Sequence, residues 1–360
     1  DETALSMIHS QLEGWIAGMK MITLSMGGRY APRELAKALQ GGDTFITDYL
    51  LDEVISVQTP AVQRFLLVIS IVDRFCASLC AALINGDEVD CDPHACLDYI
   101  ETTDLFVTPL DFHQEWFRYP RMFRDLLRQR LSNTLTSEQV NALHGRAANW
   151  FAANNLLDEA IHHALEGGYL ELAAQVMKQG LCDLLNREDL PTIERWLNLM
   201  PEEFIHRSNE LLMMKAWNHG MKWEFDQLMH VLEQLEALPD DYHDPTWSQI
   251  MQGQISTLKG HYAYYFNQYN QAVTLSQNGL TLLPEAWRYV RGVAGVYLGI
   301  SLYSTGHAHD AEKFLTEQYA TFSMSRIDGS SLRFLMAMAL NSINAGNYEV
   351  AERYARALLH

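Results

Sequence analysis

The sequence contains few prolines and no long apolar run, and each shortage excludes a class of protein. Only 10 of the 360 residues are proline, 48% are hydrophobic and 20% are charged, which is typical of a folded globular chain rather than a disordered one. No run of about 18 uncharged apolar residues exists. The first residues also lack the basic and apolar regions of a secretory signal. We therefore expect a cytoplasmic chain that makes no contact with a membrane.

Basic residues are scarce as well. The chain has 26 Lys and Arg against 45 Asp and Glu, which gives a net charge of −19 at pH 7. Nonspecific affinity for nucleic acid comes from Lys and Arg side chains that neutralise phosphates. Because the balance here is strongly acidic, we expect no direct nucleic-acid contact by this chain.

Familiar catalytic motifs are missing from the sequence. It has no G-x-S-x-G elbow, no H-E-x-x-H and no G-x-x-x-x-G-K-[ST] phosphate loop. We therefore predict that the chain is not an enzyme, that it has no catalytic residues and that it holds no cofactor of its own.

Cysteine is also rare, with five residues in the whole chain. A chain of this length can build a sufficient core without disulfides, so the thiols are expected to be reduced. Cys91, His94 and Cys96 lie close together in sequence. A structural zinc ion needs four ligands at a recognisable spacing, and no second pair follows. The sequence therefore predicts no metal site.

The most informative segment runs from Leu105 to Leu131. Its first half alternates apolar and polar residues around Asp111, which is typical of a β-hairpin. In its second half, apolar residues recur at the spacing of a helix. These residues are Phe123, Leu126, Leu127 and Leu131. A hairpin between helices in an otherwise helical chain is the outline of a winged helix.

Four arginines of this segment form a basic stripe, namely Arg118, Arg121, Arg124 and Arg128. In an acidic chain such a cluster repels itself unless an acidic neighbour compensates it. We interpret the stripe as a coupling surface that faces another module. The alternative is a solvated helix face with local partners, which is what most charge runs are.

From Leu131 onward the sequence is helical and repetitive. Small residues recur in pairs twelve positions apart: Ala148 and Ala160, Gly260 and Ala272, Gly299 and Ala311, and Ala339 and Ala351. In tetratricopeptide-like hairpins the two helices touch at these positions, since only small side chains let the backbones approach. Residues that tolerate left-handed dihedrals lie between the members of each pair. They are Asn154-Asn155, Asn267-Gln268, Gly306-His307 and Gly346-Asn347.

The predicted fold is therefore all-α, with a winged-helix-type domain that contains a small β-hairpin, followed by a tetratricopeptide-like α-solenoid. Its clearest repeat is Gly253–Ala286. Between Leu165 and Met251 the small residues no longer follow this spacing. Two helical hairpins are still predicted there, Tyr169–Leu185 with Leu190–Leu199 and Leu211–His219 with Glu224–Leu238. The loop Leu238–Trp247 is either a ligand-facing or partner-facing insertion or an ordinary surface loop.

The first helix of each repeat lines the concave face of such a solenoid, where binding surfaces usually lie. Counting from the small residues places five candidate ligand-binding residues there: Gln254, His261, Tyr264, Tyr303 and Arg333. Four tryptophans lie near the same helix ends: Trp217, Trp223, Trp247 and Trp287. They either stack on a sugar-like or aromatic inducer or fill the solenoid core, which is the more common role.

The Leu105–Leu131 segment, with its W-F-R-Y and L-L-R-Q-R-L runs, also resembles a known family. It is similar to the winged-helix segment of the large ATP-binding LuxR-type transcription regulators, which are signal-transducing ATPases. Leu12–Met26 resembles the helix that closes their ATPase module, and Asp48–Ile84 resembles the helices that follow it. Family members usually carry a histidine after the tyrosine, whereas Pro120 follows Tyr119 here. Proline has neither a donor nor a titratable ring, so this position cannot sense a nucleotide phosphate.

The resemblance implies three parts: residues 1–44 as the helical end of an ATPase module, 45–131 as a winged-helix coupling domain, and 132–360 as the repeat sensor. The implied partners are the ATPase module of the same polypeptide, a small-molecule inducer, an inhibitory protein and further copies of the chain. ATP or ADP and DNA would be bound by the full-length protein outside this chain. The implied function is that of a regulatory segment that binds an inducer or partner and controls oligomerisation and DNA binding. The alternative is a helical-repeat scaffold for proteins that takes no small ligand.

Overall fold

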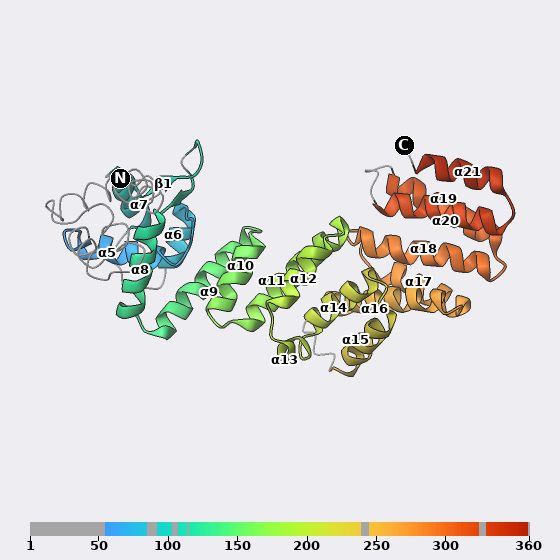
Figure 1. Cartoon of the computed structure of the whole chain (residues 1–360), viewed down its shortest axis with the longest axis horizontal. Helices are drawn as coiled ribbons and strands as arrows, with labels where there is room; N and C mark the ends of the chain where they lie inside the picture. The colour runs from blue at the N-terminus through green and yellow to red at the C-terminus, as the bar shows by residue number, and fades with distance from the viewer. Residues whose placement is uncertain are drawn as a thin grey trace, which may run out of the picture. The chain divides into compact units, whose positions relative to one another are not determined.

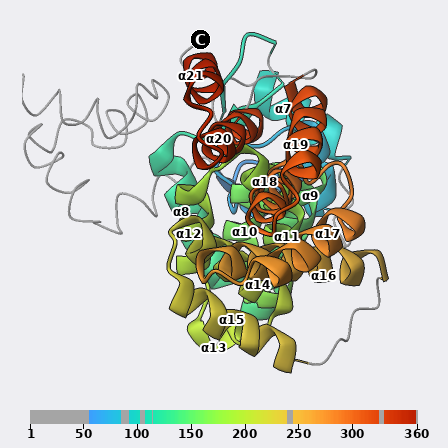
Figure 2. The ribbon, with the colours of Figure 1, turned by 90° about the vertical axis from the view of Figure 1, so that its right-hand side faces the viewer.

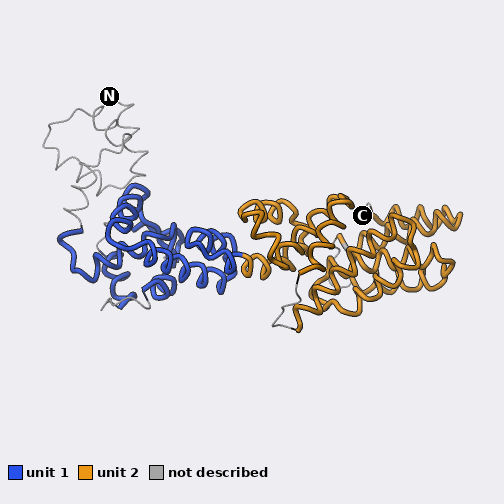
Figure 3. Tube along the Cα trace, turned by 90° about the horizontal axis from the view of Figure 1, so that it is seen from below, with its two compact units in different colours: residues 1–173 blue, residues 174–360 orange. Residues whose placement is uncertain are grey.

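The computed structural model describes residues 55–84, 92–102, 107–113, 115–238, 245–323 and 329–358 (Figure 1). The chain divides into two compact units, one that ends at Ala173 and one that begins at Ala174 (Figure 3). Both units are helical, and the strands of the described residues form a two-stranded sheet. The predicted all-α fold class is therefore confirmed. The predicted ATPase-module helix, Cys91 and most of the loop after Leu238 lie outside the described residues.

The described part of the first unit includes three helices before the wing: α5 (Pro60–Ile69), α6 (Ala77–Ile84) and α7 (Pro93–Thr102). Helix α5 begins where the Thr59 hydroxyl accepts a hydrogen bond from the Val62 N–H at 3.4 Å. Proline at the first helical position costs nothing there, since that N–H has no partner within a helix. The apolar face of α5 is buried, and Phe65, at its centre, is fully enclosed.

The predicted β-hairpin is present between α7 and the next helix. Strand β1 (Thr108–Pro109) pairs antiparallel with β2 (Phe117–Arg118). The Asp111 carboxylate holds the bend, because it accepts hydrogen bonds from the N–H groups of Glu115 at 3.0 Å and Trp116 at 2.7 Å. These hydrogen bonds, the one from Glu115 foremost, lower the pKa of Asp111. The hairpin is the wing of the predicted winged helix.

The wing is tied to the helical core through Phe75. The backbones of Phe75 and Phe117 exchange two hydrogen bonds of 2.9 and 2.8 Å, so β2 is bonded on both of its edges. Helix α8 (Arg121–Thr134) follows the wing. It buries the apolar residues that the sequence predicted: Phe123, Leu126, Leu127 and Leu131.

Cys76, Cys80 and Cys182 are free thiols, as expected. Cys96 is disulfide-bonded, so the expectation of reduced cysteines is wrong at that position. Among the residues that the structure describes, no group of three or more His, Cys, Asp or Glu side chains is placed to hold a metal ion. Within the same residues, no helix has the length and apolar character needed to cross a membrane.

Helical hairpins continue after α8. The first is α9 (Ser137–Ala153) with α10 (Leu157–Glu166), and Ala148 and Ala160 are buried between them. The following hairpins are α11 (Leu170–Arg187) with α12 (Leu190–Asn198), α14 (Asn209–Met221) with α15 (Phe225–Ala237), α16 (Pro245–Tyr265) with α17 (Tyr269–Leu282), α18 (Arg288–Ser304) with α19 (Ala308–Ser323), and α20 (Gly329–Asn344) with α21 (Tyr348–Ala357). A short helix, α13 (Glu202–Ile205), precedes α14. Figure 2 shows the last four helices, α18 to α21, stacked on one another.

The predicted turn residues adopt the left-handed conformation. Asn155, Asn267, Gly306 and Gly346 have φ angles of 57°, 60°, 88° and 76°. In each turn the N–H of this residue bonds the carbonyl three positions back, and the next N–H bonds the carbonyl five positions back. These bonds satisfy carbonyls that the helix end leaves unpaired. The turn chemistry predicted from the sequence is thus confirmed.

The small residues do mark the contacts between the helices of a hairpin, but one partner is shifted from the prediction. A Cβ atom on Gly260 would lie 2.8 Å from Ser276 Oγ and 3.3 Å from Ser276 N. The residue that faces Gly260 is therefore Ser276, one turn beyond the predicted Ala272. A Cβ atom on Gly299 would likewise meet Leu315, one turn beyond Ala311.

We predict that Gly260→Leu destabilises the chain by about 1–3 kcal/mol, because the new side chain overpacks the contact with α17. Ala272→Leu should do the same, since Ala272 is fully buried. Urea unfolding of the two variants is the measurement. Asn270→Leu on the exposed face of α17 is the control, and equal midpoints for Gly260→Leu and this control would refute the close contact.

Candidate functional site

The second unit contains a cavity of about 190 Å³, which we call the inner cavity. Its walls come from the first helices of successive hairpins, α14, α16, α18 and α20, and from two of the turns between hairpin helices. The principal lining residues are Trp217, His261, Tyr289, Val296, Tyr297 and Arg333 from the helices, and Glu188 and Trp223 from the turns. First helices line the cavity, as expected for a solenoid binding surface.

An ion pair closes one side of the inner cavity. Arg333 Nη1 donates to Glu188 Oε1 at 2.9 Å, and Nη2 donates to Oε2 of the same carboxylate, so the pair is bidentate. The guanidinium also lies 5.0 Å above the ring of Tyr289. Burial lowers the pKa of Arg333, but hydrogen bonding to Glu188 outweighs it and the net shift is upward. Arg333 is therefore held in its charged form.

His261 in the cavity wall is a neutral imidazole. Its side chain is 6% exposed, and its ring stacks on Tyr297 with 4.4 Å between centroids. Burial lowers the pKa of His261 to about 4, because the charged form loses its hydration. Its Nε2 atom is buried and has no hydrogen-bond partner among the described residues. Since buried polar atoms are nearly always bonded, a ligand group is a natural partner for it.

Gln254 and Tyr264 stand behind the cavity wall. Gln254 is fully buried, and its Oε1 accepts a hydrogen bond of 2.7 Å from Trp217 Nε1. Tyr264 is half-buried, and its ring packs 5.4 Å from that of Tyr297. Burial raises the pKa of Tyr264. The two predicted residues therefore orient lining side chains and do not themselves line the cavity.

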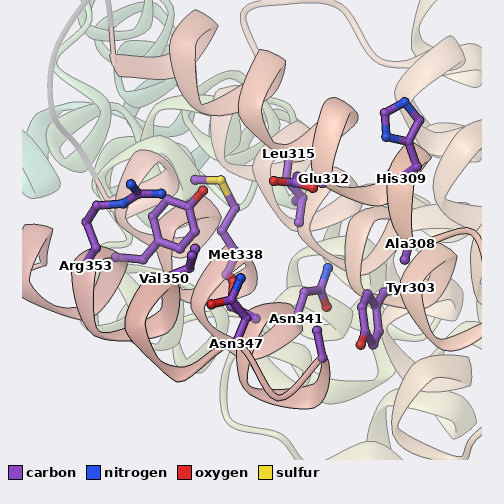
Figure 4. Close-up of a pocket in the computed structure, with 13 residues that line it drawn as sticks. Tyr303, Ala308, His309, Glu312, Leu315, Met338, Asn341, Asn347, Val350 and Arg353 are labelled. Atoms are coloured by element: carbon purple, nitrogen blue, oxygen red, sulfur yellow. The ribbon is translucent and has the colours of Figure 1, made fainter.

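Tyr303 lies in a different place, a second cavity of about 350 Å³ between α18, α19, α20 and α21, which we call the end cavity. Figure 4 shows Tyr303 and Arg353 on opposite sides of it, with Met338 and Asn341 between them. Asn341 is 8% exposed, and its Oδ1 has no partner among the described residues. Of the five predicted ligand-binding residues, the structure brings only His261 and Arg333 into one cavity.

Sequence reasoning missed Glu188 and favoured the wrong role for Trp223. Both are turn residues with left-handed backbones, with φ of 57° and 64°. The side chain of Trp223 is 54% exposed, whereas Trp217, Trp247 and Trp287 are buried in the solenoid. The core role predicted as more common thus holds for these three. The sequence did contain a signal for both residues, because they occupy turn positions that carry Asn or Gly in the other hairpins.

Two of the stripe arginines have partners within the first unit. Arg124 Nη1 bonds Asp73 Oδ1 at 2.8 Å. Arg128 donates to the carbonyls of Ser70 at 2.7 Å and Ile71 at 2.8 Å, and to Asp73 at 3.0 Å. The compensating acidic neighbour is therefore part of this chain. For Arg124 and Arg128 the interpretation as a helix face with local partners is the one that the structure shows.

Arg121 is exposed, and Arg118 is half-buried on β2. The wing is joined to the first helical hairpin by the edge contact of Trp116 with Trp150 and by Arg74, which the sequence did not single out. Arg74 bonds Glu159 of α10 at 2.5 Å, and its guanidinium lies 4.6 Å above the ring of Trp116 in the wing. Arg74 thus connects the wing and the repeats within the first unit.

Comparison with known proteins follows this architecture. Residues 51–139 match the family of the MalT winged helix domain. The HTH-type transcriptional regulator MalT of Yersinia pestis (strain Pestoides F) is 27% identical over 291 residues, which cover 80% of this chain and 32% of that protein. MalT of Yersinia pseudotuberculosis serotype O:1b (strain IP 31758) matches with the same figures. The chain therefore spans about a third of the length of these relatives.

A solved structure shares the fold. It is a Signal Transduction ATPase with Numerous Domains (STAND) protein with a tetratricopeptide repeat sensor from Pyrococcus horikoshii. The match has a TM-score of 0.58 at 14% identity and covers 95% of this chain and 58% of that chain. The chain thus carries a MalT-type winged helix followed by tetratricopeptide-like repeats. The resemblance drawn from the sequence is confirmed for these two parts.

We predict that Arg128→Ala destabilises the first unit by about 1–3 kcal/mol, because two carbonyls lose a charged donor. Arg121→Glu should change stability by less than about 0.5 kcal/mol, as surface substitutions usually do. Urea unfolding of both variants tests this. Equal losses in the two variants would mean that Arg128 adds nothing beyond a solvated charge.

We also predict that His261 makes the chain less stable in mild acid. Its folded-state pKa of about 4 lies below the ordinary value of 6.5, so the unfolded chain binds the proton more readily. The stability that depends on neutral His261 is fully present above pH 6.5. As the pH falls toward 4, the free energy of unfolding decreases by up to about 1.4 kcal/mol per pH unit. Buried His163, whose pKa is lowered to about 3, acts in the same direction.

Urea unfolding at pH 7 and pH 5 measures this effect. The pH dependence should be smaller in His261→Phe and unchanged in His309→Phe, an exposed position of the same unit. An unaltered pH dependence in His261→Phe would contradict the assignment.

Proposed function

We propose that the second unit is the sensor of an ATP-dependent transcription regulator of the LuxR type. In this proposal a small-molecule inducer binds the inner cavity and controls self-association and DNA binding, which other parts of a longer cytoplasmic polypeptide perform. Support comes from the relatives, since MalT is named as a transcriptional regulator and the similar structure as a STAND ATPase with a repeat sensor. This chain itself performs no catalysis, and ATP or ADP binds the ATPase module.

The observation that carries the proposal is the ion pair at the wall of the inner cavity. Glu188 and Arg333 are 145 positions apart in sequence, and their contact joins the turn after α11 to the last hairpin of the unit. A ligand at this point touches elements from the first and the last described hairpins of the second unit. If it binds the joined and separated arrangements with different affinity, it shifts the population between them. The winged helix would then pass the change to the ATPase module.

Arg121 remains a candidate for that coupling step. Arg121 is exposed on α8, so it is accessible to an acidic surface of the ATPase module. Exposed ion pairs contribute only about 0–1 kcal/mol, which suits a contact that must form and break. An inhibitory protein is a further partner that such a surface would accept.

A scaffold that docks a protein segment without any small ligand is the second candidate. The end cavity favours it, because this larger space lies between the last hairpins and includes the exposed Arg353. Polar side chains there, such as Asn341 and Asn347, would bond the backbone of a docked segment.

The test is a thermal-shift screen of the chain against small metabolites. A compound that binds the folded state stabilises it by about 2.7 kcal/mol at a hundredfold excess over Kd. The response should vanish in Val296→Phe, which fills the inner cavity, and persist in Val350→Phe, the matched substitution in the end cavity. Loss of the response only in Val350→Phe would move the site to the end cavity. No response to any compound in the unaltered chain would favour the scaffold.

A further inference from the structure

Several turns between helices of the described residues follow one backbone design, and two of these turns carry an unexpected residue at the left-handed position. Seven turns of the described residues share the hydrogen-bond pattern given above for Asn155. Their left-handed residues are Asn155, Gly168, Glu188, Trp223, Asn267, Gly306 and Gly346. Asn and Gly enter this conformation readily, whereas other residues lose roughly 1–2 kcal/mol there. Only Glu188 and Trp223 among these turns carry that strain.

Both residues line the inner cavity. A residue with a strained backbone is usually retained where its side chain makes a contact that glycine cannot make. For Glu188 this contact places a carboxylate beside Arg333 at the beginning of α20. A Cβ atom on Gly329, the first residue of α20, would collide with this carboxylate, so the approach depends on glycine there. Trp223 places its ring 5.4 Å from that of His261, at the open side of the cavity.

The charges of the cavity restrict what it accepts. Glu188 and Arg333 neutralise each other, and each is about two-thirds buried. A ligand with a single charge would pair with one of them and leave the other without a partner, which is unfavourable because both groups are about two-thirds buried. A ligand with one positive and one negative group avoids this cost, because its carboxylate can take the guanidinium while its ammonium takes the Glu188 carboxylate.

The remaining walls are apolar and aromatic. Tyr289 and Tyr297 are nearly buried, and Val293 and Met221 lie in the same lining. His261 adds its unpaired Nε2, which can bond one polar group of a ligand. At about 190 Å³ the cavity is smaller than the 300–1,000 Å³ of drug-sized sites, so the ligand is a small metabolite.

We propose that the inner cavity binds a free L-α-amino acid with an apolar or aromatic side chain. Its carboxylate bonds Arg333, its ammonium bonds Glu188, and its side chain packs against Tyr289 and Tyr297. Insertion between the two charged groups separates the turn after α11 from α20, which would be the structural signal. This inference rests on the proposed sensor function and names the ligand class for it.

Calorimetric titration of the chain with each of the common L-amino acids at millimolar concentration is the first test. At least one apolar or aromatic amino acid should bind with a single site. Its N-acetyl derivative and its amide, which each lack one charge, should bind at least about tenfold more weakly. Equal affinity for the blocked forms would overturn the inference, and so would the absence of binding by every amino acid.

The double variant Glu188→Gln with Arg333→Gln is the second test. It removes both charges and leaves no unpaired ion, so the chain keeps its fold, which its melting curve verifies. Amino-acid binding should fall at least about tenfold, while Arg353→Gln in the end cavity should leave it unchanged. Undiminished binding by the double variant would overturn the inference.

The outcomes separate this inference from the proposed function. If neutral sugars or polyols bind and lose affinity in Val296→Phe, while no amino acid binds, the cavity is a sensor site and the amino-acid assignment is wrong. If no small molecule of any class binds, the sensor proposal and the ligand class both fall.

Discussion

The close approach of two helices where small residues face the partner helix of a hairpin is the constraint on which the rest of this structure depends. Gly260 packs against Ser276 so tightly that no side chain fits between them. The left-handed turn after each first helix satisfies the last carbonyls and reverses the chain within a few residues. Because every hairpin is closed in this way, the first helices stack as a layer and bring His261 and Arg333 to one cavity.

The same turn also explains why the cavity has a charged wall. The side chains of two turn residues, Glu188 and Trp223, reach helices outside their own hairpins, where they contact Arg333 and His261. Glu188 uses this position to bond Arg333, at the expense of backbone strain that Asn or Gly would relieve. Trp223 does the equivalent for the aromatic side of the cavity. Function and stability are therefore in opposition at these two residues.

In the first unit, contacts with the helical core stabilise the short wing. Its wing is too short to be stable alone, since β1 and β2 have two residues each. Backbone bonds to Phe75 and the contacts of Arg74 with Glu159 and Trp116 hold it in place. Arg128 adds to this by bonding the carbonyls at the end of α5. The basic stripe is thus in part an internal support of the winged helix.

The sequence by itself determined the helices, the hairpin of the wing and the turns, because apolar spacing, Asp111, and Asn or Gly between small residues act over a few positions. It also indicated that the first helices of the hairpins share one face, and these helices line the inner cavity. Only the tertiary structure decided which side chains meet. Gln254 accepts a hydrogen bond from Trp217 behind the wall of the inner cavity, and Tyr303 lines the end cavity instead. The contact of Glu188 with Arg333 spans 145 positions, and no local pattern encodes an ion pair over that distance.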